Sequence, residues 1–475
     1  MTPAARQQFI SIVGPKGFLD RQEDLALYEY DGGVDKSRPA MVLFPKTTED
    51  VAAIALTAAQ HKISIVGRGA GTGLSGGAIP IEGAVMIAFS RMNKILEIDL
   101  PNECMTVQPG VVNLDISLAV ANSGYFYAPD PSSQRACTIG GNVAENAGGP
   151  HTLAYGVTTN HVLGLEFVTP DGEIHTAGGK GGDLPGLDLI GLLTGSEGTM
   201  VLVTKVTVRL MRQPEKVKTL LAIYNTANAA ADTVAEITAC AITPVAVEML
   251  DGEMLQMVER ATNAGYPLDA AAVLLIELEG LTEAVEDQAE EIRAVCERCG
   301  AREFRVAKSA EERDLLWKGR KNAFGAVGRV STSYYVQDGV VPRTQIAPTL
   351  RYIAEVSKQF NVRISNIFHA GDGNMHPIIL FDRHSADELH RAKEAGDAIL
   401  RYCISVGGSI TGEHGVGMEK RELMTDQFSA DSLSMMRSFK NLFDPEARLN
   451  PGKMLPMGHG CMEIHQLPLA PATTV

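Results

Sequence analysis

Residues 67–78 read Gly-Arg-Gly-Ala-Gly-Thr-Gly-Leu-Ser-Gly-Gly-Ala, and this run constrains the fold more than any other stretch of the chain. Such closely spaced glycines let the backbone curl until several N–H groups converge on an anion such as a pyrophosphate. Residues 71–76 also match G-x-G-x-x-G, a pattern that opens a helix in Rossmann folds. Here the strand-like sequence AIPIEGAVMIAF follows, so we predict an anion-binding loop outside a Rossmann fold.

The sequence around this loop alternates strand and helix signals. Apolar runs at 41–45 and 63–67 predict strands, and Thr47 with Asp50 resembles a capping box that starts a helix between them. The further predicted elements are strands at 85–90, 95–100 and 104–110, a helix at 113–124, and a hairpin turning at Pro170-Asp171-Gly172. We expect this α+β region to close near residue 212.

The second half of the chain has a different pattern. From residue 214 the order of runs is β-α-β-β-α-β, which predicts an open antiparallel sheet with helices packed on one face. Longer helices are predicted around 309–329, 344–360 and 385–405. We therefore divide the chain into three parts: residues 1–213, residues 214–440, and a C-terminal segment 441–475 that ends in a loose tail.

Composition narrows the function classes. At 475 residues the chain is long enough for two or three domains, and its net charge of −15 excludes nucleic-acid binding through a broad basic face. The seven cysteines are scattered, which favours a reducing compartment, and the lone pair Cys296 and Cys299 lies at the end of a helical stretch, where a structural role is expected. We find no secretory signal and no apolar run of about 18 residues, so we expect a cytoplasmic protein with no membrane span.

Two further glycine-rich segments follow the first loop. Residues 138–149 read TIGGNVAENAGG, and residues 195–199 read GSEGT. Each supplies backbone donors and positions of close approach. A lone glycine cluster is as often a mobile surface loop as a binding site, but three in one region favour a cofactor site.

The second part of the chain, residues 214–440, contains a possible metal site. His369 and His376 bracket a Gly-Asp-Gly-Asn turn, and a hairpin there would bring both imidazoles to one end of a sheet. Glu413 and His414 follow in a second glycine-rich turn. Two imidazoles and a carboxylate suit Zn²⁺ or a similar divalent ion. A lone histidine is more often structural, and at this point the residues support ligation and a structural role about equally.

Taken together, these segments carry a family resemblance. The glycine-rich segments resemble the flavin-binding domain of vanillyl-alcohol-oxidase-type FAD oxidoreductases. With WKGRKNAFGAVGR (317–329), FHAGDGNMHP (368–377), SITGEHGVG (409–417) and FDPEARLNPGK (443–453), the chain is similar to the glycolate oxidase and D-lactate dehydrogenase branch of that family. The resemblance covers residues 28–453, and these four motifs, preceded in the chain by the glycine-rich segments 67–78 and 138–149, form a highly specific set of six.

The resemblance implies an α+β fold in which FAD lies between a two-part binding domain and a ferredoxin-like α+β cap. Some relatives link the flavin through a histidine of the first loop; Thr72 occupies that position here, so we expect FAD to be non-covalent. The implied flavin contacts are Gly67, Gly69, Ala70, Gly71, Thr72, Gly73, Pro131, Ser132, Thr138, Gly140, Gly141, Asn142, Asn146, Gly148, Glu197, Gly198, Asn450 and Lys453.

Oxidation of a 2-hydroxy acid requires loss of the hydroxyl proton and transfer of a hydride from the α-carbon to the flavin. The resemblance implies a metal bound by His369, His376 and Glu413, because a divalent ion lowers the pKa of a bound hydroxyl. Our choice for the base is His414; the alternative is that it only supports the ligands. Arg320 is the expected partner of the substrate carboxylate and Asn374 a further contact, although Lys321 and Arg329 share the arginine's helical stretch.

The substrate is expected to be small. The 2-hydroxyglutarate enzymes of this family carry a threonine and a lysine that suit a second carboxylate, and here Phe324 and Val336 occupy those places. An apolar lining favours glycolate or D-lactate.

The resemblance also implies partners, namely a second flavin-fold subunit and an iron–sulfur subunit, through which the protein would reach the inner membrane. We weigh three alternatives: a stand-alone D-lactate dehydrogenase, a non-catalytic flavin-carrying assembly subunit, and a metal hydrolase. The last would leave the glycine loops unexplained.

Overall fold

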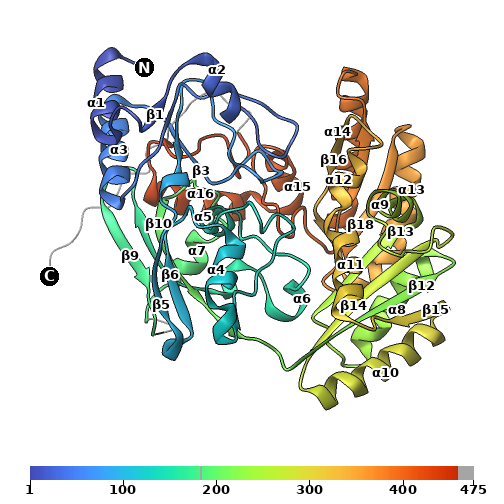
Figure 1. The fold of residues 1–475 in the computed structure, drawn as a ribbon. Helices are drawn as coiled ribbons and strands as arrows, with labels where there is room; N and C mark the ends of the chain where they lie inside the picture. The colour runs from blue at the N-terminus through green and yellow to red at the C-terminus, as the bar shows by residue number, and fades with distance from the viewer. Residues whose placement is uncertain (182–184, 458–475) are drawn as a thin grey trace.

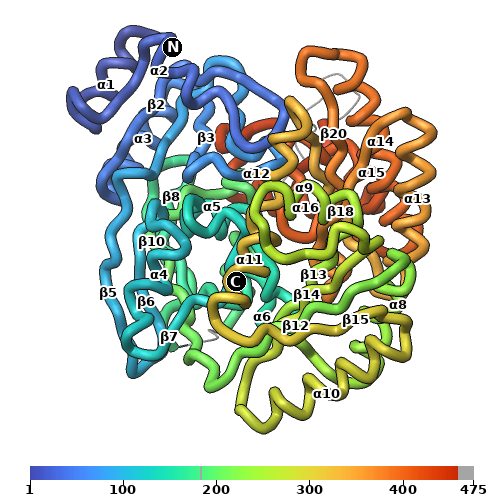
Figure 2. The backbone as a smooth tube through the Cα atoms, turned by 45° about the vertical axis from the view of Figure 1, so that its right-hand side comes forward, coloured from blue at the N-terminus to red at the C-terminus, as the bar shows by residue number. Residues whose placement is uncertain are grey.

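The computed structural model describes residues 1–181 and 185–457, and the expected loose tail after residue 457 lies outside that range. The N-terminal half and the cap lie side by side (Figure 1). Figure 2 shows the same two parts after a rotation of 45° about the vertical axis. The C-terminal helices α15 (Met424–Gln427) and α16 (Ala430–Phe443) lie back against the N-terminal half in Figure 1. The amine of Lys440 on α16 donates to the carbonyl of Thr199, which joins this C-terminal helix to the N-terminal half.

The first sheet of the N-terminal half forms as the sequence predicts. Its strand order is β1-β2-β4-β3, and β2, β4 and β3 run parallel. The capping box of Thr47 and Asp50 starts α3, whose Val51 and Ile54 pack on the sheet. The elements are α1 (Pro3–Val13), β1 (Phe18–Leu19), α2 (Gln22–Leu25), β2 (Met41–Leu43), α3 (Thr48–His61), β3 (Ile65–Arg68) and β4 (Val85–Ala88).

The second sheet is antiparallel, in the order β5-β6-β10-β8-β9, and the predicted hairpin at residues 170–172 joins β8 to β9. The second glycine loop is helical over α5, which the sequence did not suggest. Thr138 has extended backbone angles and ends the preceding loop, and an added Cβ at Gly140 would lie 2.6 Å from Pro109. The elements are β5 (Ile95–Asp99), β6 (Cys104–Val107), α4 (Asn113–Val120), β7 (Tyr125–Phe126), α5 (Ile139–Glu145), α6 (Thr152–Tyr155), β8 (Val162–Val168), β9 (Ile174–Gly178), α7 (Leu189–Leu193), β10 (Leu202–Arg209) and β11 (Met211–Arg212).

The cap is built on a large antiparallel sheet. Its first four strands lie in the order β15-β12-β14-β13, which is the strand order of a ferredoxin-like fold, and β18, β19 and β17 extend it. The strands are β12 (Lys216–Tyr224), β13 (Ala246–Asp251), β14 (Ala272–Gly280), β15 (Ala301–Val306), β16 (Ser333–Val336), β17 (Gly339–Val340), β18 (Arg363–His369), β19 (Asn374–Met375) and β20 (Pro377–Phe381). The helices are α8 (Ala227–Ala239), α9 (Gly252–Thr262), α10 (Thr282–Arg298), α11 (Ala310–Lys321), α12 (Ala323–Val327), α13 (Ile346–Gln359) and α14 (Ala386–Ser405).

The prediction that helices cover only one face of this sheet is wrong. Helices α8, α10, α13 and α14 pack in one apolar core, and α9, α11 and α12 pack in a second core on the other face. The reason lies in the strands: residues 272–278 of β14 are all buried, so both faces of the sheet need a cover. Helix α9, absent from the sequence prediction, supplies part of the second cover and ends at Asn263 in a left-handed conformation.

Candidate active site

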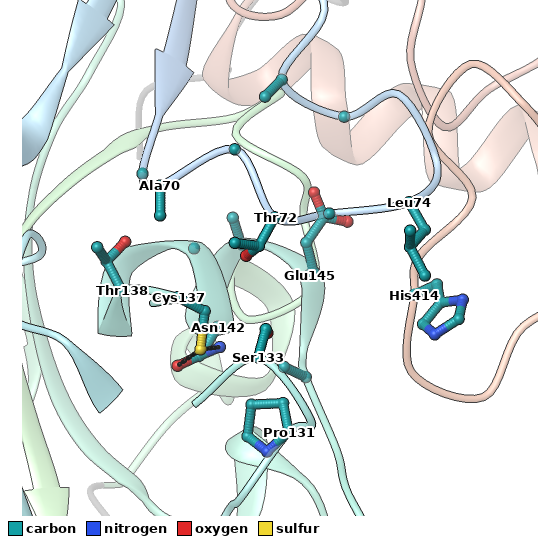
Figure 3. A pocket seen from close by; sticks show the side chains of 18 of the residues that line it. Ala70, Thr72, Leu74, Pro131, Ser133, Cys137, Thr138, Asn142, Glu145 and His414 are labelled. Carbon is teal, nitrogen blue, oxygen red and sulfur yellow. Dashed lines mark hydrogen bonds between the residues drawn. The ribbon is translucent and has the colours of Figure 1, made fainter. Parts of the chain in front are cut away.

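A cavity of about 610 Å³ lies between the two halves of the protein. The first glycine loop, residues 131–133 and helix α5 line one side, and Arg320, Phe324, His376 and His414 line the other. In Figure 3, Thr138 and Asn142 lie on one side of the cavity, and His414, on a loop of the C-terminal part of the chain, lies on the other side beyond Thr72. Glycine-loop backbone and cap side chains therefore meet across one enclosed space.

The first loop depends on glycine at specific positions. An added Cβ at Gly69 would lie 2.3 Å from the hydroxyl oxygen of Thr138, and Gly71 has a positive φ of 72°. The loop is also tied to the chain's start, because the N–H of Gly32 donates to the carbonyl of Gly73. Side chains at these positions would push the two glycine-rich segments apart.

Most of the predicted flavin contacts line this cavity. They are Gly67, Gly69, Ala70, Gly71, Thr72, Gly73, Pro131, Ser132, Thr138, Gly140, Gly141, Asn142, Glu197, Gly198 and Asn450. We call the cavity wall formed by the glycine-rich segments the cradle. The Asn450 amide donates to the carbonyls of Gly77 and Glu197, at 2.8 and 2.7 Å, so the C-terminal segment closes the cradle.

Three predicted contacts lie behind the cavity wall. Asn146 ends α5, and its side-chain amide oxygen Oδ1 accepts the N–H of Thr159. Gly148 packs so closely that an added Cβ would lie 3.0 Å from a carboxylate oxygen of Glu413. The Lys453 amine donates to the carbonyl of Ile79, and its burial lowers its pKa to about 8. These residues shape the cradle rather than line it.

Sequence reasoning missed Glu145, which lines the cavity beside Thr72 (Figure 3). Burial and the neighbouring charge of Glu197 raise the pKa of Glu145 well above its ordinary value. The Glu197 carboxylate accepts the N–H groups of Val416 and Gly417 and thereby fixes the cap loop against the cradle.

The predicted metal ligands converge. The Nε2 atoms of His369 and His376 each lie 3.2 Å from the same Glu413 oxygen, Oε1. Two ligand atoms each about 2.1 Å from a tetrahedral ion lie roughly 3.4 Å apart, close to this spacing. His376 and Glu413 line the cavity, and His369 lies behind them, buried. The hairpin expected from the sequence is present, with His369 paired to Asn374 across β18 and β19.

The hydrogen bonds of the two imidazoles favour a cation between them and Glu413. His376 Nδ1 lies 3.1 Å from the carbonyl of Gln337, which can only accept, so Nδ1 carries the proton. A neutral ring then points an Nε2 lone pair at a carboxylate oxygen. Burial alone would lower the pKa of His369, but Glu248 and Glu413 raise it well above its ordinary value. The carboxylates of Glu248 and Glu413 therefore stabilise a positive charge beside His369, and a bound divalent ion would supply such a charge.

His414 lies next to this group. Its ring stacks on that of His376 at 5.0 Å between centroids and 10° between planes, and its Nε2 is 3.8 Å from Glu413 Oε1. Burial lowers the pKa of His414 to about 4, so its imidazole is neutral at physiological pH. A neutral, partly exposed imidazole on the cavity wall can accept a proton from a bound hydroxyl.

A second residue that the sequence did not reveal, Asp338, holds the turn that carries Glu413 and His414. Its carboxylate accepts the backbone N–H groups of Gly412, Glu413 and His414, together with the hydroxyl of Thr411. Asp338 is fully buried and its pKa is held below the ordinary range, against the effect of burial, by His414 and Lys420. The one sequence signal is an aspartate before Gly339 at the end of a strand.

Arg320 reaches the cavity from α11 and is 2% exposed. Its Nε donates to Glu248 at 2.5 Å, which leaves its terminal N–H groups without a hydrogen-bond partner among the described residues. Asn374 does not line the cavity: it pairs with His369 and Val340 in the sheet and packs against Gly412. Lys321 lines the cavity near its rim and is about one-third exposed.

Residues 213–454 match the C-terminal domain of the FAD linked oxidases, and residues 39–178 match an FAD binding domain. The chain belongs to the FAD-linked oxidase family. Within residues 1–181 and 185–457, no helix of this FAD-linked oxidase is long and apolar enough to cross a membrane.

Similar proteins cover almost the whole chain. Glycolate oxidase subunit GlcD of Escherichia coli (strain K12) is 46% identical, with 94% of this chain and 89% of the relative covered. The GlcD subunit of Bacillus subtilis (strain 168) is 41% identical, with 96% and 97% covered. D-lactate dehydrogenase of Anaerostipes hadrus is 32% identical, with 91% of each chain covered. Among solved structures, p-cresol methylhydroxylase has a TM-score of 0.81 at 19% identity, covering 95% of this chain and 96% of its own, which shows the vanillyl-alcohol-oxidase-type fold.

The cavity fits the FAD that defines this oxidase family. Buried polar atoms on its wall lack a partner among the described residues, namely Arg68 Nη1, Thr138 Oγ1 and Asn450 Oδ1. Buried polar groups in native proteins are normally satisfied, so these atoms require a polar ligand. The protein is an FAD-dependent oxidoreductase, and the expected fold and the expected binding of FAD are confirmed.

Proposed function

We propose that this protein oxidises a small 2-hydroxy acid, glycolate or D-lactate, to the 2-oxo acid, with FAD bound non-covalently and a divalent metal ion, Zn²⁺ first, at His369, His376 and Glu413. One observation carries the proposal: the convergence of both Nε2 atoms on Glu413 at the wall of the flavin cavity, next to His414. The similarity to glycolate oxidase subunits and D-lactate dehydrogenases supports the substrate class.

The cap residues divide the chemistry between them. When bound, flavin accepts a hydride and a divalent ion lowers the pKa of a coordinated hydroxyl. The terminal N–H groups of Arg320 bind the substrate carboxylate as a planar fork. His414 Nε2 takes the hydroxyl proton while the Cα–H bond breaks as a hydride, which leaves a C=O at the α-carbon. Asn374 supports this site from the sheet behind it.

Protein partners follow from the same similarity. Two relatives are named as subunits, and we propose that this chain passes electrons to a second flavin-fold subunit and an iron–sulfur subunit. Through them a cytoplasmic protein would reach the inner membrane.

The experiment that tests the proposal is anaerobic. Glycolate, D-lactate, L-lactate and D-2-hydroxyglutarate are added separately to purified protein, and the visible absorption of the flavin is followed. We expect rapid bleaching by glycolate or D-lactate and its loss after chelation. A protein that holds FAD and metal but is bleached by none of these acids would favour the non-catalytic assembly subunit instead.

Phe324 is expected to limit substrate size. It lines the cavity one helical turn after Arg320, and its ring stacks on Tyr334 at 6.0 Å. Replacing it with alanine should raise kcat/KM for 2-hydroxybutyrate relative to glycolate by about tenfold, since one methylene in an apolar pocket is worth roughly 1–3 kcal/mol. Tyr352→Ala, which breaks the stacked pair with Tyr402 elsewhere in the cap, is the control. An unchanged ratio in Phe324→Ala would contradict this role.

A further inference from the structure

Glu248 connects the two parts of the substrate site. It lies on β13, directly opposite His369 on β18, and its side chain is completely buried. One oxygen, Oε1, lies 2.7 Å from His369 Nδ1, and the other, Oε2, accepts from Arg320 Nε at 2.5 Å. A single carboxylate therefore bridges a metal-ligand candidate and the arginine that faces the cavity.

The His369 and Arg320 side chains each need a hydrogen-bond acceptor at the position of Glu248. Arg320 Nε can only donate, and His369 must donate from Nδ1 if its Nε2 is to bind a cation. A carboxylate satisfies both requirements at once. The side chain of Glu248 has no exposure to solvent, so these two groups are its hydrogen-bond partners among the described residues.

The bridge also fixes a spacing. Arg320 arrives on α11, from one face of the cap sheet, and His369 lies within the sheet. Only the Glu248 carboxyl group, with one hydrogen bond on each side, lies between Arg320 and His369. Hydrogen bonds to a charged group are stronger than those between neutral groups. The positions of the His369 imidazole and of the Arg320 guanidinium are therefore set by the same residue.

We propose that Glu248 is a positioning residue that holds Arg320 and His369 at the spacing of an acid whose hydroxyl carbon is next to its carboxylate. This inference rests on the proposed function and deepens it. It assigns the preference for 2-hydroxy over 3-hydroxy acids to one buried carboxylate that contacts neither substrate nor flavin.

Glu248→Gln is a sharp test because it keeps the shape and removes the second acceptor. If the amide oxygen faces Arg320, the NH₂ group faces His369 Nδ1 and forces the tautomer whose Nε2 carries the proton. If the amide oxygen faces His369, two donors face each other at Arg320. Either orientation breaks one side of the bridge. Glu248→Asp, which keeps the charge but is one methylene shorter, is a second variant in case the glutamine protein folds poorly.

Glu277→Gln is the matched control. Glu277 is also a buried cap glutamate, 1% exposed, and it also accepts from an arginine of α11, Arg313, at 2.8 Å. It does not line the cavity. The control removes the charge of a buried glutamate that pairs with a partly exposed arginine of the same helix, and Glu277 has no hydrogen bond to His369 or Arg320.

The measurements use the FAD-loaded protein after chelation, with Zn²⁺ as the titrant. For Glu248→Gln we expect Zn²⁺ affinity to fall about 10–100-fold, as for other residues that orient metal ligands. The KM for the best 2-hydroxy acid should rise about tenfold or more and its preference over 3-hydroxypropionate should shrink, because a misplaced arginine loses a charged hydrogen bond. FAD content should equal wild type, and Glu277→Gln should keep wild-type Zn²⁺ affinity and KM even if it melts earlier.

The outcomes separate cleanly. Wild-type Zn²⁺ affinity and KM in Glu248→Gln would overturn the inference, and so would equal losses in Glu277→Gln. A wild-type protein that binds no Zn²⁺ would overturn it together with the metal site, while flavin bleaching by a 2-hydroxy acid would still stand. A wild-type protein that binds Zn²⁺ but is reduced by no 2-hydroxy acid would refute the proposed function, and the Zn²⁺ titrations would still decide whether Glu248 orients His369.

Discussion

Replacing His414 by alanine is expected to slow flavin reduction by about 10²–10⁴-fold, the usual contribution of a general base. FAD should stay bound, because the glycine-rich cradle is built by the other half of the protein. Metal should also stay bound, because the Nε2 atoms of His369 and His376 still face Glu413. Stopped-flow measurement of flavin bleaching, with flavin and metal content determined on the same samples, checks all three expectations.

The control for this variant is His161→Gln. His161 is also a buried histidine whose pKa burial lowers to about 4, but its Nε2 lies 2.9 Å from the carbonyl of Tyr155, outside the cavity. Wild-type reduction rates in His414→Ala would refute the assignment of the base. Equal slowing in both variants would point to a general loss of structure.

The same assignment predicts a pH dependence. A base must be neutral to accept a proton, and the pKa of His414 is lowered to about 4. The rate of flavin reduction should therefore be independent of His414 protonation at neutral pH and fall as the pH drops through about 4 to 5. An ordinary histidine, with a pKa near 6.5, would already lose activity below about pH 7.

Replacing His369 by alanine is expected to give the second large effect, a loss of bound metal together with a loss of activity of about 10³-fold or more. The variant lacks one of the three proposed ligand atoms. Glu248 and Glu413 also lose the His369 imidazole that lies between their carboxylates. Elemental analysis of the purified variant, alongside bleaching by the best substrate, measures both losses.

His384→Ala serves as the control, because His384 is exposed and lies outside the flavin cavity. Chelation of the wild-type protein should reproduce the effect of His369→Ala, and added Zn²⁺ should restore the chelated wild type but not the variant. Full metal occupancy in His369→Ala would rule out this ligand set.

Features encoded by nearby residues could be predicted from the sequence. The capping box before α3 and the histidine hairpin depend on contacts between residues a few positions apart, and the first glycine loop is recognisable from its composition alone; all three are present in the structure. The helical form of α5 was not predicted, because Gly140 and Gly141 disfavour a helix unless the surrounding packing selects one.

Features that depend on distant contacts could not be predicted. Glu248 and Asp338 look like ordinary polar residues beside strands, and their roles arise only when α11, β18 and the turn at 411–414 meet them. Likewise the second helical layer of the cap follows from burial of β14 on both faces, which a single strand's apolar run does not distinguish from burial on one.

The amide of Asn450, which ties Gly77 to Glu197, has a consequence for how the protein is made. The glycine loops are synthesised early, but the residue that joins them comes from the far end of the chain. Folding during translation proceeds from the N-terminus, so the flavin pocket cannot close until Asn450 has left the ribosome. Cofactor loading should therefore be post-translational, and a prematurely terminated chain would be released as an open, flavin-free species.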